Sequence, residues 1–286
     1  MKIALLPNLT RQNAAEVTKN ICLFLENSNV EIMFEKKMKG VFSDRYAYLD
    51  DAQLFSSCDI VVAVGGDGSI IHAAKKAYKY SKAILGINAG GLAFMAGLEK
   101  HETELLSRLV QGDYSTDRRM LLEMQIFDAD GSMFAEESCC VNDIVIARGK
   151  MIKLVRLNVS CDGNRINEYY ADGIIVSTPT GTTAYSLSAG GPVVDPRIES
   201  IVLTPICTHS LFSRSIIFDS ESEICVSVPE DEKDEICVSV DGEDSIVIKP
   251  SSRVVIKKSA DYADFIRIKN DSFIDVLNSK LAQRRV

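Results

Sequence analysis

An aspartate lies among glycines where an apolar run ends, in the stretch DIVVAVGGDGSIIHAAKKA at residues 59–77. The glycines and the aspartate are Gly65, Gly66, Asp67 and Gly68. Glycine tolerates positive φ and carries no side chain, so backbone amides can meet an anion there. A helix that begins at Ser69 would favour phosphate at its start. A carboxylate is an unusual neighbour for a phosphate, because both are negatively charged. It could instead bind a substrate hydroxyl, take its proton or meet a metal-bound phosphate.

The same stretch is also compatible with a simple strand-to-helix turn that has an aspartate near the helix start. It is not a Walker motif, because no GK[ST] follows, and it is not a GxGxxG dinucleotide turn. His72 lies three residues into the expected helix, where it could contact a ligand or be a surface or capping residue. The turn alone leaves both interpretations open.

A second segment, ADGIIVSTPTGTTAYSLSAGGP at residues 171–192, concentrates hydroxyl groups after an apolar strand. The hydroxyls of Thr182 and Thr183, with exposed amides near Gly181, could hold sugar or phosphate oxygens. Tyr185 could stack on a flat ring. A capped helix with a packed tyrosine is the alternative, but ordinary capping needs only one Ser or Thr. The excess favours a binding loop.

The elements that would position these residues follow two rhythms. Residues 1–112 alternate apolar strand patterns with helical ones, which predicts a parallel, doubly wound α/β sheet. We expect helices over 10–27, capped by Thr10, over about 69–80 and over about 101–110. Ligands of such sheets bind beyond the carboxyl ends of the strands, where the glycine–aspartate turn lies.

Beyond residue 118 the pattern changes to many short strands separated by Asp-Gly turns, including one at 241–242. This predicts a β-rich, β-sandwich-like second domain with one helix, inside 177–191. We place the α/β domain at 1–117 and the β-rich domain at 118–261. The helical tail at about 262–286 is expected to return to the first domain.

Composition limits the class of protein. The chain has 286 residues, 46% hydrophobic residues and a net charge of −8, which suits a globular protein and argues against a broad nucleic-acid surface. Its eight cysteines include no CxxC pair, which suits a reducing cytosol. No run approaches a transmembrane helix or a signal peptide. We therefore expect a cytoplasmic protein with no membrane or nucleic-acid partner.

Taken together, these stretches resemble the ATP-dependent NAD kinase family. GGDGS is similar to the family's GGDGT-type turn, and DGIIVSTPTGTTAYSLSAGGP matches its longest motif closely. NAGGLAFMA, VNDIVIARGK, PICTHSLFSRSI and VSVDGE resemble further landmarks in family order. The resemblance implies transfer of the γ-phosphoryl group of ATP to the 2′-hydroxyl of NAD's adenosine ribose, giving NADP and ADP.

The resemblance also implies roles for individual residues. Asp67 would receive the 2′-hydroxyl proton, with the amides of Gly65, Gly66, Gly68 and Ser69 near the phosphates. Asn142 and Asp143 would hold ribose hydroxyls on the nicotinamide side, and Phe94 would line the pocket. Further NAD contacts would come from Thr183, Ala184, Tyr185 (against the adenine) and Ser188, from Asp172 across a subunit boundary, and from His72, Lys153 and Tyr170.

The resemblance further implies Mg²⁺ or another divalent metal with the nucleotide, no all-protein metal cage, and a homo-oligomer, dimer or tetramer, assembled through the second domain. Departures from the family pattern are Asp143 in place of glutamate, Ala93 before Phe94, and Glu243 where glutamine is common. A diacylglycerol-kinase-like lipid kinase shares the turn but does not explain residues 177–188. A non-catalytic dinucleotide-binding regulator is the other alternative.

Overall fold

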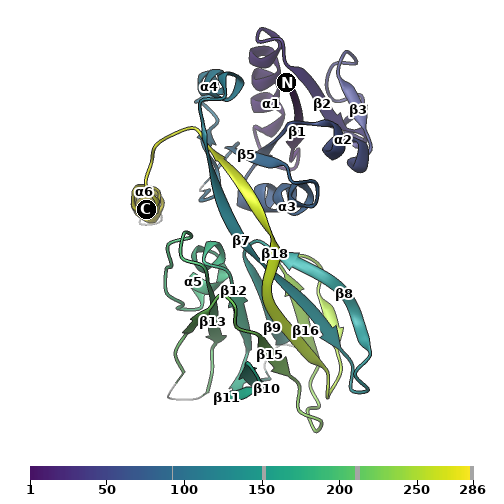
Figure 1. The fold of residues 1–286 in the computed structure, drawn as a ribbon, viewed down its shortest axis with the longest axis vertical. Coiled ribbons are helices and arrows are strands. Elements are labelled where there is room, and N and C mark those ends of the chain that lie inside the picture. The colour runs from purple at the N-terminus through teal and green to yellow at the C-terminus, as the bar shows by residue number, and fades with distance from the viewer. Residues whose placement is uncertain (92, 150–152, 210–212, 284–286) are drawn as a thin grey trace. The chain divides into compact units, whose positions relative to one another are not determined.

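The structure is a computed structural model that describes residues 1–91, 93–149, 153–209 and 213–283 (Figure 1). The chain divides into two units. The first comprises Met1–Arg118 and Ala263–Val286, and the second comprises Arg119–Tyr262. Two long strands, β7 (Ser115–Phe127) and β18 (Arg253–Arg267), carry the chain across the boundary in sequence. The predicted pairing of an α/β region with a β-rich region is confirmed.

The first unit contains a parallel sheet with the strand order β3-β2-β1-β4-β5. Its strands are β1 (Lys2–Pro7), β2 (Glu31–Glu35), β3 (Ala47–Leu49), β4 (Ile60–Gly65) and β5 (Ala83–Asn88), and a short β6 (Leu98–Glu99) pairs with β5. Every residue of β4 is buried, as expected of a central strand covered on both faces.

Helices α1 (Ala14–Glu26), α2 (Asp51–Ser57) and α3 (Asp67–Ala77) connect these strands. α1 shares a buried cluster with apolar side chains of β1 and β4, and α4 (Leu106–Gln111) contributes Leu106 and Leu109 to it. The expected Thr10 cap is wrong, because α1 begins at Ala14 and the Thr10 hydroxyl donates instead to Asn8 Oδ1 at 2.7 Å.

The start of α3 also differs from the prediction. The helix begins at Asp67, with Gly66 as its N-cap, two residues before the expected Ser69. Asp67 is therefore the first helical residue. A carboxylate in the first turn is favoured there because it faces the positive end of the helix dipole.

The second unit contains two sheets. One includes β11-β10-β15-β18, and β7 pairs with β18 and β8; the other has the order β14-β13-β12-β9-β16-β17. The remaining bounds are β8 (Met133–Cys140), β9 (Asp143–Arg148), β10 (Val155–Cys161), β11 (Asn164–Ala171), β12 (Gly173–Ser177), β13 (Ser200–Ile206), β14 (Ile216–Asp219), β15 (Ile224–Ser227), β16 (Ile236–Val240) and β17 (Ile246–Ile248).

Alternate residues of β10, β15 and β16 are buried, so these strands have one apolar face. One cluster of buried side chains draws on both sheets, including Leu157 of β10, Val254 of β18, Ile144 of β9 and Val176 of β12. This shared core is the sandwich-like packing that the alternating pattern predicted.

The segment at 177–191 forms a 3₁₀ turn (Thr180–Thr183) and a single helical turn, α5 (Tyr185–Ser188). The tail contributes α6 (Phe273–Gln283) to the first unit, where the end of β18 pairs in parallel with β5 at Phe265 and Ile84. None of the helices in the described residues is long and apolar enough to cross a membrane.

Candidate active site

The glycine–aspartate turn lies where neighbouring parallel strands end. Gly65, the last residue of β4, is in register with Asn88, the last residue of β5, and the Ala89 amide donates to the Gly65 carbonyl at 3.0 Å. A cavity of about 450 Å³ opens here. It is lined by Arg11, Gln12, Asn13, Gly65, Gly66, Asp67, Gly68, Asn88, Gly90 and Gly91. Its position matches the expected ligand edge of an open α/β sheet.

The glycines of the turn provide space rather than unusual backbone angles. Gly65, Gly66 and Gly68 do not use the positive φ that glycine tolerates. A Cβ on Gly65 would lie 2.5 Å from Ser69 Oγ, which requires glycine for close packing. A Cβ on Gly66 or Gly68 would meet nothing within 4 Å, which leaves the backbone beside the cavity open to a ligand.

Backbone amides from a following loop hold the Asp67 carboxylate. The Phe94 amide donates to Oδ2 at 2.9 Å and the Met95 amide donates to Oδ1 at 2.8 Å. Each carboxylate oxygen can accept a second hydrogen bond, so a substrate hydroxyl can still approach the half-buried group. Asp67 and Phe94 are thus brought together, and Asp67 orders the loop that carries Phe94.

Ser69 has a structural role at this turn. Its hydroxyl accepts from Asn8 Nδ2 at 2.8 Å, and its amide donates to the Gly66 carbonyl at 2.9 Å. The amide is therefore engaged within the start of α3. Asn8 was not foreseen as a site residue, although its place directly after an apolar strand was a usable signal. His72 is exposed on α3.

In the second unit, the Asp241 carboxylate organises the predicted ribose-binding pair. It accepts from the amides of Val141 at 2.9 Å, Asn142 at 2.7 Å and Asp143 at 3.2 Å. Asp241 itself has a φ of 52°, in the turn that ends β16. Sequence reasoning interpreted this Asp-Gly pair only as a hairpin turn and missed its positioning role.

Asp143 lies in a strongly desolvated place. Only 5% of the residue is exposed. Burial raises the pKa of its carboxyl to about 7, and the nearby negative charge of Asp241 adds to the increase. Hydroxyl donors from a ligand would stabilise the ionised carboxylate here. A buried carboxyl with a raised pKa is a usual mark of a functional site, although structural clusters can produce it too.

The hydroxyl-rich segment packs tightly against residues 141–143. The Thr178 hydroxyl donates to the Val141 carbonyl at 2.6 Å and accepts from the Gly181 amide at 3.0 Å. A Cβ on Gly181 would lie 2.0 Å from the Asn142 carbonyl oxygen, so only glycine fits. The structure thus brings this segment together with Asn142 and Asp143.

The buried hydroxyls of this segment are used internally. Thr182 is fully buried; its hydroxyl donates to the Pro179 carbonyl at 2.6 Å and accepts from the Val194 amide at 3.1 Å. The expectation that Thr182 holds ligand oxygens is therefore wrong. The predicted NAD contacts lie nearer the surface: Thr183 and Ala184 are half-buried, whereas Tyr185 and Ser188 are exposed. The Thr183 hydroxyl donates to the Thr180 carbonyl at 3.2 Å.

The remaining predicted residues lie elsewhere in the second unit. Asp143 pairs with Ser177 at one end of β9 and β12, whereas the Arg148 amide donates to the Asp172 carbonyl at the other end. Roughly 15 Å of strand separates these ends. The Asp172 carboxylate is paired with the Arg148 guanidinium at 3.0 and 3.2 Å. Within one chain, the structure does not bring Asp172 together with Asn142 and Asp143.

Tyr170 and Lys153 are both exposed. Tyr170 packs edge-on against His209, with ring centroids 6.2 Å apart, and Lys153 is paired with Asp234 at 3.3 Å. Glu243 is exposed in the turn after β16, and Ala93 is buried. The motif residues Leu92, Lys150 and 210–212 lie outside the described residues.

Among the described residues, no group of three or more His, Cys, Asp or Glu side chains is arranged to hold a metal ion. Asp67 is the carboxylate among the residues that line the 450 Å³ cavity. A divalent cation there would therefore take most of its ligands from nucleotide phosphates and water, as Mg²⁺ commonly does.

The sequence of this chain matches models of known protein families. Residues 3–114 match the ATP-NAD kinase N-terminal domain, and residues 141–268 match the ATP-NAD kinase C-terminal domain. The NAD kinase of Thermoanaerobacter sp. (strain X514) is 35% identical over 99% of both chains. That of Legionella pneumophila (strain Paris) is 33% identical over 94% of this chain and 91% of the relative.

Solved structures share the fold. Yeast NADH kinase complexed with NADH superimposes with a TM-score of 0.89 over 99% of this chain and 87% of that chain. An NAD kinase from Archaeoglobus fulgidus in complex with ATP gives 0.77 over 99% of each chain. Both are 22% identical in sequence. From the domain matches and the relatives that exceed 30% identity over nearly the whole chain, this protein belongs to the NAD kinase family.

Proposed function

We propose that this chain is an ATP-dependent NAD kinase, which transfers the γ-phosphoryl group of ATP to the 2′-hydroxyl of NAD's adenosine ribose and releases NADP and ADP. The observation that carries the proposal is the oriented Asp67 carboxylate beside a cavity at the start of α3, in a chain that belongs to this family. The fold neighbours bound to NADH and to ATP support both kinds of ligand.

In the proposed reaction, Asp67 accepts the proton of the 2′-hydroxyl while the 2′-oxygen bonds to the γ-phosphorus. The bond between that phosphorus and the bridging oxygen of ADP breaks, and ADP leaves with the electron pair. Phosphoryl transfer depends mainly on positioning and charge stabilisation. The amides of Phe94 and Met95 orient the carboxylate, and the open backbone at Gly66 and Gly68 gives phosphate oxygens close access.

The second unit is proposed to bind NAD. Asn142 and Asp143 would accept from and orient ribose hydroxyls on the nicotinamide side, since Asp241 holds their backbone in place. Thr183, Ala184 and Ser188 would contact the dinucleotide, and the exposed Tyr185 would stack against the adenine. His72 and Lys153 remain proposed ligand contacts because both are exposed.

We propose Mg²⁺ or another divalent metal as part of the donor, held by the ATP phosphates with Asp67 as the nearest carboxylate of the cavity. Such an ion neutralises phosphate charge during transfer. The residues present fit this arrangement, since the Asp67 carboxylate and the open backbone of Gly66 and Gly68 line the cavity where the phosphates would lie.

A homo-oligomer, dimer or tetramer, is proposed because Asp172 and Tyr170 lie at the opposite strand ends from Asn142 and Asp143. A second subunit could supply Asp172 to the site, whereas the same chain could not reach it without rearrangement. Sedimentation velocity would test this: an active monomer would contradict it. The eight cysteines are all free thiols, which supports the proposed cytoplasmic location.

The decisive experiment incubates the purified protein with Mg-ATP and NAD and follows NADP with an NADP-specific dehydrogenase. Steady formation of NADP that requires both substrates is expected. Absence of NADP from NAD, and of NADPH from NADH, with ATP, other triphosphates or polyphosphate would overturn the proposal. NAD binding without any turnover would instead indicate a regulator. The lipid-kinase alternative is not favoured by the family membership.

A further inference from the structure

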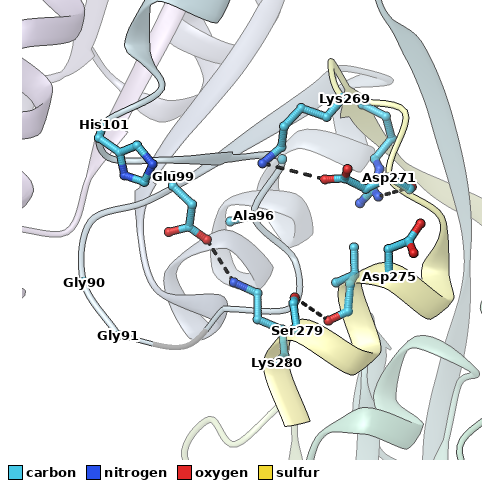
Figure 2. Close-up of a pocket in the computed structure, with 13 residues that line it drawn as sticks. Gly90, Gly91, Ala96, Glu99, His101, Lys269, Asp271, Asp275, Ser279 and Lys280 are labelled. Carbon is cyan, nitrogen blue, oxygen red and sulfur yellow. Dashed lines mark hydrogen bonds and ion pairs between the residues drawn. The ribbon is translucent and has the colours of Figure 1, made fainter. Parts of the chain in front are cut away.

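The C-terminal helix is attached to the first unit close to the glycine–aspartate turn. Lys280 of α6 is paired with Glu99 at 2.9 Å, and only 12% of the lysine side chain is exposed. Figure 2 shows this pair at the rim of a cavity of about 690 Å³, between α6 and the loop that contains Gly90 and Gly91. Gly90 and Gly91 also line the 450 Å³ cavity beside Asp67.

The other oxygen of Glu99 binds a buried asparagine. Glu99 Oε2 accepts from Asn88 Nδ2 at 2.8 Å, while Oε1 accepts from Lys280. Asn88 is 2% exposed and ends β5, in register with Gly65. A buried amide with a defined set of partners holds its neighbours in one arrangement, because any other leaves polar groups unsatisfied.

Asn88 in turn fixes the loop that follows it. Its Nδ2 donates to the Gly91 carbonyl at 2.6 Å, and its Oδ1 accepts from the Gly90 amide at 3.1 Å. A few residues later, the same loop presents the amides of Phe94 and Met95 to the Asp67 carboxylate. Hydrogen bonds thus run from α6 through Glu99 and Asn88 to Gly90 and Gly91, in the loop that also carries the amides of Phe94 and Met95.

The two lysines and the arginine around the larger cavity are already engaged. Lys269 is paired with Glu102 at 2.9 Å, Lys280 is paired with Glu99, and Arg267 Nη2 donates to the Asp271 carbonyl at 3.3 Å. The two lysines attach the tail to the rest of the unit. Their arrangement favours a role in positioning over recognition of a separate anion.

We propose that Asn88, Glu99 and Lys280 are positioning residues for phosphoryl transfer: the docked C-terminal helix sets the loop that orients Asp67. The role in catalysis rests on the proposed function, whereas the structural link from α6 to Asp67 does not. Displacement of a reacting group by about 1 Å can cost about a hundredfold in rate, so even a small loop shift would be measurable.

The first test removes the lysine charge but keeps its stem. Lys280→Met is expected to lower kcat about tenfold, equivalent to about 1.4 kcal/mol, while KM for NAD changes less than about twofold. Lys269→Met is the matched control, because it breaks the Lys269–Glu102 pair of the same tail, while the Glu99 carboxylate keeps Lys280 and Asn88 and Glu102 can still accept from the Glu99 amide. It should leave kcat within about twofold of wild type.

Hydrogen exchange provides a readout that needs no activity. In Lys280→Met, the amides of Phe94 and Met95 should exchange about tenfold faster, because a less fixed loop breaks their hydrogen bonds to the Asp67 carboxylate more often. In Lys269→Met they should exchange as in wild type. Asn88→Ser, which keeps a short polar group, should give the larger change of the same kind. Equal exchange in wild type and Lys280→Met would overturn the proposal, as would equal effects of the two lysine substitutions.

A double substitution separates positioning from general destabilisation. If Lys280 acts through Asp67, adding Lys280→Met to Asp67→Asn should lower the residual kcat far less than about tenfold. Full additivity would overturn the proposal, and so would faster exchange with unchanged kcat. If wild type makes no NADP, the proposed function fails, and the exchange comparison still decides whether the helix controls this loop.

Discussion

Two regions rich in small residues, one in each unit, use those residues in opposite ways. In the turn at 65–69, glycines leave open space around a half-buried carboxylate that loop amides hold. In the segment at 177–191, a glycine packs against the backbone of Asn142, and several hydroxyls form hydrogen bonds with backbone groups of the same unit. The first region is shaped to admit a ligand, whereas the second is largely a scaffold whose outer residues are available.

The same contrast holds for two carboxylates, Asp67 in the turn and Asp143, which lies beside the segment at 177–191. Asp67 is half-buried and accepts from two amides, whereas Asp143 is 5% exposed and lies near the negative charge of Asp241. A motif rich in Gly, Ser and Thr therefore does not by itself indicate which atoms meet a ligand. Long-range packing decides which hydroxyls remain free.

The largest expected effect comes from the open region. Asp67→Asn should lower turnover by about 10²- to 10⁴-fold, because the amide cannot take the hydroxyl proton. The variant should remain folded, since an asparagine oxygen can still accept one of the loop amides. Asp59→Asn at the opposite end of β4, where the carboxylate accepts from the Lys2 amide, is the control. Turnover within about tenfold of wild type would remove Asp67 from the base role.

The pH dependence of stability should reveal the buried carboxyl of Asp143, which lies beside the segment at 177–191. Its pKa is raised from 3.8 to about 7, so the folded state keeps a proton that the unfolded state has lost between these values. The contribution of Asp143 to the free energy of unfolding should therefore fall by about 1.4 kcal/mol per pH unit from near pH 4 to near pH 7. The contribution is fully present below pH 4 and absent above pH 7.

Asp143→Asn should remove this contribution, so that the variant gains stability relative to wild type as the pH rises from 4 to 8. Urea unfolding at several pH values measures it. Asp244→Asn, at an exposed aspartate, is the control that should leave the profile unchanged. Parallel profiles for wild type and Asp143→Asn would contradict the raised pKa.

Alanine at matched glycines tests the contrast between open and filled space directly. Gly181→Ala should destabilise the protein by about 3 kcal/mol or more, because its Cβ would collide with the Asn142 carbonyl. Gly68→Ala meets no atom within 4 Å and should leave stability unchanged or raise it by up to about 1 kcal/mol. Urea unfolding compares the two.

For activity per folded molecule we expect the reverse: Gly68→Ala should lower it more than Gly181→Ala. Gly68→Ala should lower kcat/KM about tenfold or more, since its methyl group occupies space beside the cavity. A stable, fully active Gly68→Ala protein would indicate that phosphate does not approach this backbone.

The smallest expected effects distinguish a buried hydroxyl of the segment at 177–191 from an exposed one. Thr182→Val should lower the free energy of unfolding by about 1–3 kcal/mol, because the Pro179 carbonyl and Val194 amide lose their partner. Ser188→Ala, at an exposed position, should leave stability unchanged and raise KM for NAD. Denaturant unfolding and initial rates on both variants measure the pair. A raised KM in folded Thr182→Val with unchanged stability would reverse the assignment.

Much of the fold was predictable because its signals are local. A continuous apolar run such as 60–65 indicates a strand buried on both faces of a parallel sheet. Alternating apolar residues, as in β16, indicate a strand with one buried face. The boundaries were less accurate: α3 begins at Asp67 because Gly66 takes the N-cap, and α1 begins at Ala14 because Asn8 engages Thr10. Those outcomes depend on competing hydrogen bonds that no local pattern encodes.

The site was predicted in part. Asp67 accepts from the Phe94 amide, and Asn142 and Asp143 lie against the hydroxyl-rich segment, while the ligand contacts of all four residues stay predictions. Asn8, Asn88 and Asp241 were missed as positioning groups. Asp241 was interpreted as an ordinary turn residue, because the amides that it accepts from lie about a hundred positions earlier in the chain.

By itself, the amino-acid sequence determined the two kinds of sheet, the family and the aspartate at the end of β4, because periodicity and contiguous motifs are properties of neighbouring residues. The tertiary structure decided which of the hydroxyls are buried, which glycine must be a glycine, and how the C-terminal helix reaches the loop beside Asp67. These depend on atoms that meet only after the chain has folded, when the desolvation of each polar group and the space for each Cβ are set.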